Sequence, residues 1–109
     1  MKKVLAYQMI SEVFKTLAHP LRIQILLTLS EQERCVCELL REIGVEQSNL
    51  SQHLRILKKQ GIIDSRKDGK KVFYKILLPS VMDLVIDAKK TLNDQAKGHE
   101  ELYKNLRSI

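Results

Sequence analysis

The sequence predicts a mainly helical fold with one β-hairpin, in the element order α-α-α-α-β-β-α. Apolar residues recur at helical spacing in four successive segments, and IIDSRKDGKKVFYKIL alternates around a turn dipeptide. A last apolar seam follows Pro79. The chain has 109 residues, 44% of them hydrophobic, which suits one small domain over residues 1–109 with a limited core of its own.

The first two predicted helices occupy roughly the first 30 residues. Residues 4–18 repeat apolar positions at helical spacing, as an amphipathic helix does. Pro20 suits the first position of the second helix, because its missing N–H would be unpaired there anyway. This second helix is expected to be buried because it is apolar almost all round: Leu21, Ile23, Ile25, Leu26, Leu27 and Leu29.

A short third helix and a longer fourth helix are separated by a tight turn. The third helix ends at Gly44, as helices commonly do just before a glycine. The fourth begins near Gln47 and closes at Gly61. Its inward stripe is expected to be Leu50, Leu54 and Leu57. Two helices joined by such a turn form a helix-turn-helix.

A hairpin and a long helix complete the predicted fold. Asp68-Gly69 is a strong two-residue hairpin turn, and the return strand alternates from Val72 to Leu77. Pro79 opens the last helix. Its apolar seam is predicted to continue past Gly98: Val81, Leu84, Val85, Ala88, Leu92, Ala96, Leu102 and Leu106.

Basic residues are concentrated around the fourth helix and the hairpin. Residues 41–75 contain nine Lys or Arg and four Asp or Glu, which accounts for +5 of the chain's net charge of +6. Such a segment suggests a polyanion partner, or else a solvated basic surface. The outward face of the fourth helix lacks Glu and presents polar residues: Gln47, Ser48, Asn49, Ser51, Gln52, Arg55 and Lys59.

These side chains are suited to double-stranded DNA. Polar residues near the start of such a helix reach base edges in the major groove. The hairpin adds cations for flanking phosphates: Arg66, Lys67, Lys70 and Lys71. His53, at the edge of the inward stripe, is predicted to be a hydrogen-bonded structural residue that can also touch a phosphate. The alternative is a protein-interaction module, in which the fourth helix and the hairpin bind a protein partner and no steep salt-dependent binding to duplex DNA is expected.

Four stretches resemble the ArsR/SmtB family of winged-helix repressors, nearly end to end. They are LAHPLRIQILLTL, GVEQSNLSQHLRILKKQGII with its S-x-H-L pattern, DSRKDGKKVFYKI, and CVCEL. The resemblance implies a winged helix-turn-helix that dimerises through its first and last helices. It also implies binding to an imperfect inverted repeat in operator DNA, and release when a metal binds at CVC.

Cys35 and Cys37 are the only cysteines. Thiolates are the preferred ligands of soft ions, and a helix N-terminus favours the thiolate, with Arg34 expected to help. Positions i and i+2 of a regular helix point apart. We therefore expect the first turn of the third helix to lose its helical geometry when both sulfurs hold one ion, which would disturb the fourth helix. A Cys35–Cys37 disulfide is expected to be strained for the same reason.

The chain departs from the family's metal sites. Leu40 stands where the fullest arsenite site has a third cysteine, and residues 1–18 hold none of the cysteines of the cadmium branch. Two thiolates suit As(III) or Sb(III) with a small thiol or water as last ligand, so we expect an arsenite-type inducer and no organic cofactor. Two alternatives stay open: a repressor sensing oxidants or reactive sulfur through the same cysteines, and one responding to cadmium or lead.

Other classes of protein find little support. No apolar run approaches the length of a membrane span, and the polar residues within MKKVLAYQMISEVF argue against a signal peptide. We therefore expect a cytoplasmic protein with reduced thiols. The chain has no glycine-rich phosphate loop and no paired carboxylate set, so enzymatic activity is not expected.

Overall fold

The computed structural model describes residues 2–96 and residue 104. The chain divides into two compact units, Met1–Leu77 and Leu78–Ile109, and each unit is described by itself. Within the described part of the chain, no helix has both the length and the apolar character needed to cross a bilayer.

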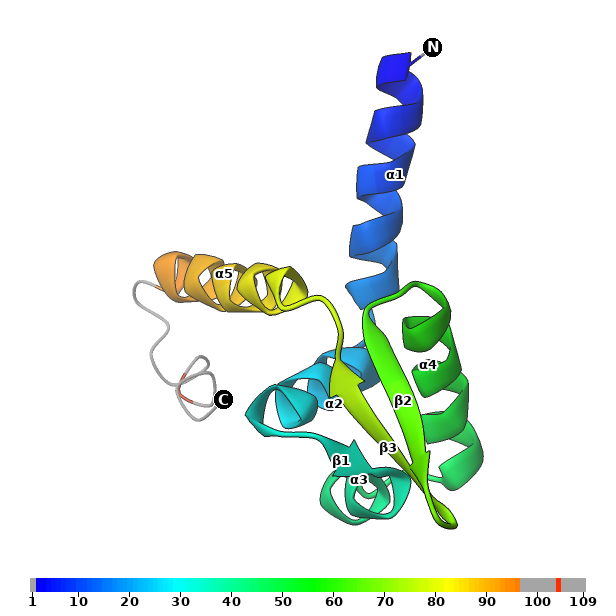
Figure 1. The fold of residues 1–109 in the computed structure, drawn as a ribbon. Helices are drawn as coiled ribbons and strands as arrows, with labels where there is room; N and C mark the ends of the chain where they lie inside the picture. Colours follow the sequence, from blue (N-terminus) through cyan, green and yellow to red (C-terminus); the bar gives the residue numbers. More distant parts are fainter. Residues whose placement is uncertain (1, 97–103, 105–109) are drawn as a thin grey trace. The chain divides into compact units, whose positions relative to one another are not determined.

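The first unit contains the four predicted helices and the hairpin, together with a short strand that the sequence pattern did not predict (Figure 1). Its elements are α1 (Lys2–Leu17), α2 (Pro20–Glu31), β1 (Arg34–Cys35), α3 (Val36–Ile43), α4 (Gln47–Lys59), β2 (Ile63–Asp68) and β3 (Lys71–Ile76). Pro20 is the first residue of α2, as predicted. The added strand β1 has only two residues, too few for alternation to be recognised in a sequence.

The three strands form one antiparallel sheet in the order β1-β3-β2. Within it Arg34 pairs with Tyr74, and Cys35 pairs with Phe73. The hairpin of β2 and β3 is the wing of the predicted winged helix-turn-helix. Strand β1 extends it by a third strand and joins the start of α3 directly to β3.

The hairpin turn lies one residue later than predicted. Asp68 pairs with Lys71, so the two-residue loop is Gly69-Lys70 rather than Asp68-Gly69. Gly69 has φ +65°, whereas no described non-glycine residue has a positive φ. That combination belongs to a type II′ turn, which requires glycine at its first central position.

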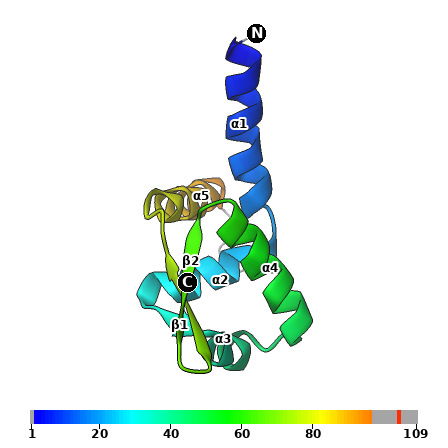
Figure 2. The same ribbon diagram turned by 45° about the vertical axis from the view of Figure 1, so that its right-hand side comes forward.

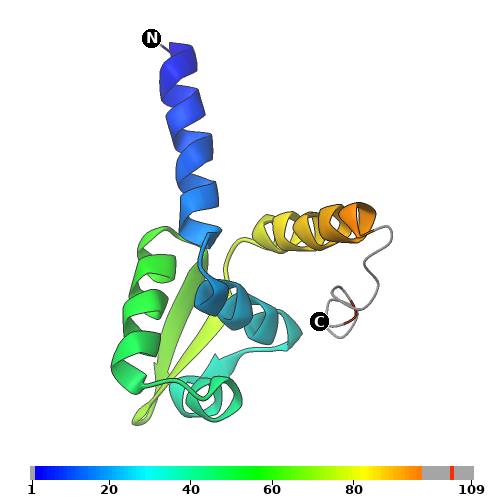
Figure 3. The same ribbon diagram turned by 180° about the vertical axis from the view of Figure 1, so that it is seen from behind.

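Apolar side chains from α2, α3, α4 and β2 form the core of the first unit. Its largest fully buried members are Ile25, Leu26, Leu39, Leu50, Leu54, Leu57 and Ile63, which confirms the inward stripe predicted for α4. Helix α2 contacts α3, α4 and β3, and Figure 3 shows it lying across the strands. The buried face of α4 therefore sets which of its residues face solvent.

Helices α3 and α4 form the predicted helix-turn-helix (Figure 2). Gly44 caps α3 with φ +75°, and its N–H donates to the carbonyl of Leu40 at 2.9 Å. This left-handed cap is favourable for glycine and ends the helix sharply. Residues 44–46 then connect α3 to α4.

Helix α1 leaves nearly all of its side chains in solvent, since only Thr16 and Leu17 are buried. Its large apolar residues are 39–65% exposed: Val4, Leu5, Tyr7, Met9, Ile10, Val13 and Phe14. An apolar surface of this extent is typical of a helix that packs against a partner.

The second unit contains α5 (Ser80–Gln95), which starts after Pro79 as predicted. Asp83 lies in its first turn, where a carboxylate complements the helix dipole. The predicted continuation of the apolar seam at Leu102 and Leu106 lies outside the described residues.

Candidate functional site

The outward face of α4 carries the side chains predicted to read DNA bases. Gln47, Ser48, Asn49, Gln52, Arg55 and Lys59 are exposed, and Ser51 is half-buried. Glu46 is the N-cap of α4, but its side chain makes no capping hydrogen bond. The backbone N–H groups of the first turn therefore lack a side-chain acceptor, and such groups bind phosphate oxygens well.

His53 lies on the flank of α4 and links this helix to α2. Its Nδ1 accepts a hydrogen bond from Nε of Arg22 at 3.0 Å, and Arg22 also donates to the carbonyl of Thr16 at 2.9 Å. The ring of His19 lies 5.3 Å away. Burial, and to a lesser degree the charges of Arg22 and His19, lower the pKa of His53. The structural role predicted for His53 is confirmed by these contacts.

Arg66 in the wing is engaged within the protein. Its guanidinium donates to both carboxylate oxygens of Glu33 at 2.6–3.2 Å, and it stacks 4.7 Å from the centre of the Phe73 ring. The hydrogen bond lowers the pKa of Glu33 and raises the pKa of Arg66. The other predicted phosphate contacts are exposed around the turn: Lys67, Lys70 and Lys71.

The two cysteines lie at the junction of β1 and α3. Cys35 is the last residue of β1 and the N-cap of α3, with extended backbone at φ −76° and ψ 160°. Their Cα atoms are 5.3 Å apart, and the sulfurs are joined in a disulfide. The expectation that both cysteines share a regular helical turn is wrong, because Cys35 precedes the helix. Both sulfurs meet in the disulfide while α3 is helical from Val36 onward, so this pairing needs no loss of helical geometry. The loss expected when both sulfurs hold one ion stays a prediction.

A capping box closes the start of α3. The backbone N–H of Glu38 donates to Sγ of Cys35 at 3.3 Å, and the N–H of Cys35 donates to Oε1 of Glu38 at 3.1 Å. The pattern is the familiar S/T-x-x-E box with cysteine in place of the hydroxyl residue, so C-x-x-E in the sequence carried the signal. Cys35 is only 2% exposed, whereas Cys37 is exposed.

Arg34 is paired with carboxylates of α2 and α3. Its guanidinium lies 2.7 Å from Glu42, 2.8 Å from Glu31 and 3.8 Å from Glu38. Arg34 therefore links the end of α2 to α3, and its expected effect on the thiols stays a prediction.

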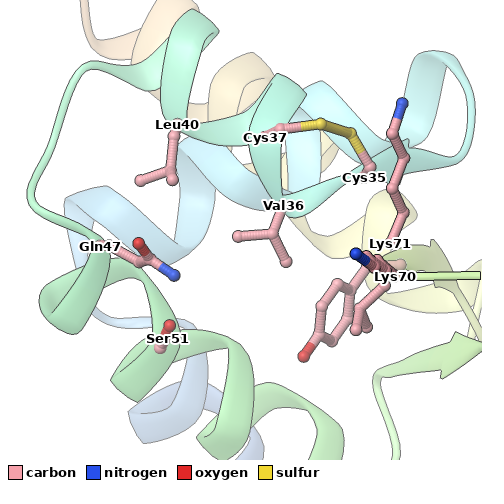
Figure 4. A pocket seen from close by; sticks show the side chains of 10 residues that line it. Cys35, Val36, Cys37, Leu40, Gln47, Ser51, Lys70 and Lys71 are labelled. Atoms are coloured by element: carbon pink, nitrogen blue, oxygen red, sulfur yellow. A yellow bond between two sulfur atoms is a disulfide. The ribbon is translucent and has the colours of Figure 1, made fainter. Parts of the chain in front are cut away.

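A hollow of about 490 Å³ brings the cysteines, α4 and the wing turn together (Figure 4). In Figure 4, Gln47 and Ser51 lie across the hollow from the disulfide, and Lys70 and Lys71 lie on the disulfide side. The full lining is Cys35, Val36, Cys37, Leu40, Gln47, Ser51, Lys70, Lys71, Val72 and Tyr74. The sequence did not predict the contribution of Val72 and Tyr74, because the pairing of β1 with β3 sets it.

The donor set beside the cysteines is small. The described residues contain no group of three or more His, Cys, Asp or Glu side chains able to hold a metal ion. Leu40 lines the hollow but offers no donor atom. Two thiolates match the chemistry of As(III) or Sb(III) only if the last ligand comes from outside this set.

Sequence comparison supports the resemblance. The family model described as "Bacterial regulatory protein, arsR family" matches residues 19–65, from the N-cap of α2 into β2. The HTH-type transcriptional regulator Rv0081 of Mycobacterium tuberculosis is 41% identical over 103 residues, covering 94% of this chain and 90% of the relative.

Solved structures share the fold. The crystal structure of M. tuberculosis Rv0081 gives a TM-score of 0.78 at 42% identity, covering 85% of this chain and 94% of the other. Reduced HlyU from Vibrio cholerae gives 0.72 at 29% identity, covering 84% and 97%. The homodimeric winged helix-turn-helix DNA-binding domain Mb0332 from Mycobacterium bovis gives 0.76 at 26% identity, covering 90% and 91%. The chain therefore belongs to the ArsR family of bacterial regulatory proteins and is a winged helix-turn-helix transcriptional regulator rather than an enzyme.

Proposed function

We propose that this protein is a cytoplasmic, homodimeric repressor whose binding to operator DNA is controlled by chemistry at Cys35 and Cys37. The observation that carries the proposal is the shared hollow. Both cysteines line it together with Gln47 and Ser51 of the α4 face. A change at sulfur therefore takes place beside the element that we expect to read DNA.

In this proposal α4 enters the major groove and the wing follows the adjacent backbone. The exposed polar residues of α4 contact base edges, with Gln suited to adenine and Arg55 to guanine. Lys67, Lys70 and Lys71 contact phosphates, which gives affinity that falls steeply with salt. His53 stays with Arg22 and positions the helix.

The exposed apolar face of α1 supports a homodimer. Large side chains such as Tyr7, Met9 and Phe14 are each more than half exposed. Helix α5 adds exposed Leu84, Ile86 and Leu92. A second copy related by a two-fold axis would cover such surfaces and present two α4 helices to an inverted repeat, and the similar Mb0332 domain is homodimeric.

The trigger that the site supports best is closure of the Cys35–Cys37 disulfide. The two sulfurs are bonded while α3 is helical from Val36 onward, and Cys35 and Cys37 are the only cysteines in the chain. In a reducing cytoplasm the bond would form only when oxidants or reactive sulfur accumulate. Because the bond ties the first turn of α3 to β1, and residues 44–46 lead directly to α4, we expect it to fix α4 in an orientation with lower operator affinity.

A second trigger, capture of As(III) or Sb(III), is favoured by the same convergence of sulfurs. Exposed Cys37 leaves the outer side of the pair open to a small thiol or water as the last ligand. This reading makes the protein an arsenic-resistance repressor.

The test uses duplexes selected from a randomised library by the reduced protein, labelled for fluorescence anisotropy. Wild type, Cys35→Ser and Cys37→Ser are titrated at three salt concentrations under a phosphine reductant, after diamide, and with arsenite plus the phosphine. We expect diamide to weaken wild-type binding at least about 10-fold, which corresponds to about 1.4 kcal/mol of binding free energy. Binding by both serine variants should be unchanged.

Each arm separates a different reading. Release by arsenite under reductant, lost in both variants, supports the metalloid trigger. A response to diamide that persists in both serine variants would contradict the control by this cysteine pair. Absence of salt-dependent binding to any duplex would contradict DNA recognition and favour the protein-interaction module.

A further inference from the structure

We propose that the hollow selects its oxidant, and that the preferred oxidant is a low-molecular-weight disulfide carrying carboxylate groups. The inference rests on the proposed function, since it names the class of molecule that oxidises Cys35 and Cys37. The oxidant preference and the proposed function can fail separately, because the preference is measured as the rate of thiol loss and repression is measured as binding to DNA.

Charge around the hollow favours an anion. The hollow is lined next to the cysteines by two lysines, Lys70 of the wing turn and Lys71 at the start of β3. No Asp or Glu belongs to its lining. Arg34, the buried cation that directly precedes Cys35, is paired with Glu31 and Glu42 and therefore adds no unpaired charge to the hollow. A dianionic molecule therefore gains affinity in this hollow that a cationic one of equal size does not.

Size and polarity favour a peptide-like molecule. A volume of about 490 Å³ lies in the range of small-molecule pockets. Val36, Leu40 and Val72 provide apolar wall, while Gln47, Ser51 and Tyr74 provide hydrogen-bonding groups. One half of a disulfide-linked peptide dimer has both apolar methylenes and amides to match such walls.

The unequal exposure of the cysteines sets the order of the chemistry. Cys37 is exposed, so its thiolate attacks one sulfur of the bound disulfide RSSR, forming Cys37–S–SR and releasing RS⁻. Cys35, which is 2% exposed, then attacks Sγ of Cys37 and expels the second RS⁻. The two thiolates released take up the two protons that the protein thiols lost. In total the protein dithiol loses two electrons and RSSR becomes two RSH.

The experiment follows thiol loss by quenched mass spectrometry on the reduced full-length chain without DNA. The probes are oxidised glutathione as the anionic disulfide, cystamine as the cationic one, bis(2-hydroxyethyl) disulfide as the neutral one, and hydrogen peroxide. The variants are Lys70→Gln/Lys71→Gln and, as a matched control, Lys75→Gln, which removes a lysine charge from β3 outside the lining.

We expect the double variant to react about 10-fold more slowly with oxidised glutathione, a typical size for electrostatic attraction in a cleft. Its rates with the neutral disulfide and with peroxide should stay unchanged, its rate with cystamine should rise, and Lys75→Gln should match wild type. An equal slowing with all four probes, or no slowing with oxidised glutathione, would overturn the proposal.

The order of attack has its own readout. With oxidised glutathione, Cys35→Ser should accumulate a glutathione adduct on Cys37, whereas Cys37→Ser should form an adduct far more slowly. Faster labelling of Cys35 than of Cys37 would contradict the assigned order. Selective oxidation without any change in operator affinity would instead refute the proposed function and leave the selection intact.

Discussion

Helices α3 and α4, the two halves of the helix-turn-helix, begin in opposite ways. The start of α3 is closed by a reciprocal capping box between Cys35 and Glu38. The start of α4 has Glu46 as N-cap and no side-chain capping bond. One helix therefore begins at the sulfur of Cys35, and the other begins with backbone N–H groups that its N-cap side chain does not cap.

The difference separates two roles within one small motif. The capped start places Sγ of Cys35, a residue of β1, in contact with the first turn of α3, so we expect this turn to respond to chemistry at that sulfur. An uncapped start presents positive dipole and unpaired donors, which suits a helix that meets a phosphate backbone. The two ends lie on one hollow, so what happens at the first is close to the second.

Helices α3 and α4 differ at their starts but are anchored alike in the core, so the largest expected effects should be equal in the two helices. Leu39 of α3 and Leu50 of α4 are both fully buried. We expect Leu39→Ala and Leu50→Ala each to lower the free energy of unfolding by about 2–5 kcal/mol, measured by urea denaturation. Arg41→Ala, on the exposed surface of α3, is the control. A much smaller loss for one leucine would show that the two helices also differ in their anchoring.

The next largest effect should appear on DNA and only from α4. We expect Gln47→Ala or Gln52→Ala to cost about 1–3 kcal/mol of discrimination between selected and scrambled duplexes, because each removes a base-edge contact. Stability should be unchanged, since both side chains are exposed. Arg41→Ala in α3 serves again as the control, and an equal loss of discrimination there would contradict the assignment of α4 as the reading helix.

The sequence predicted these helices well, and for a physical reason. Long apolar periods and end signals such as Pro20 and Gly44 are local, so each could be recognised within one segment. Strand β1 could not be recognised this way, because two residues have no period and are held only by pairing with β3. That omission led to the wrong placement of Cys35 inside the helix.

The candidate site, like the fold, was predictable from the sequence where its contacts are local and not where they join distant segments. The α4 face and both cysteines were predicted from neighbouring residues. The hollow's Tyr74 depends on the pairing of strands some 40 residues apart, and the Arg66–Glu33 pair joins residues 33 apart in the chain. Pairing at such distance has no signature in a single segment, and so Arg66 was predicted only as a phosphate ligand.

A smaller effect should separate the caps themselves. Under reductant, we expect Glu38→Ala to cost about 1 kcal/mol of stability, because it removes the acceptor for the N–H of Cys35, while Glu46→Ala costs little. Glu38→Gln keeps an acceptor and should recover most of the loss. Cys35→Ser, which also keeps an acceptor, should be milder than Cys35→Ala. Equal losses for Glu38→Ala and Glu46→Ala, measured by urea denaturation, would remove the contrast between the two starts.

His53, on the flank of α4, should make the packing of this helix against α2 sensitive to pH. The pKa of His53 is lowered in the folded protein from an ordinary value of 6.5, so the unfolded chain takes up the proton first as pH falls. The stability contributed by neutral His53 is complete above 6.5 and is lost as pH falls from there through the folded pKa. Protonated Nδ1 also cannot accept the bond from Arg22. His53→Gln should flatten the decline in melting temperature between pH 7.5 and 5.5, and an unchanged slope would contradict this role.

The smallest expected effect concerns the wing and tests whether Arg66 is held away from DNA. Glu33→Gln removes the carboxylate that accepts three contacts from the Arg66 guanidinium, while leaving an amide of the same shape. Since the pair is on the surface, stability should hardly change. Operator affinity at low salt should rise about two- to threefold, and the slope of log affinity against log salt should steepen by nearly one phosphate contact. The gain should vanish in Glu33→Gln/Arg66→Gln. If Glu33→Gln leaves both affinity and slope unaltered, then Arg66 already contacts phosphate while bound to Glu33, and the wing would share with α4 a surface that is ready for DNA without rearrangement.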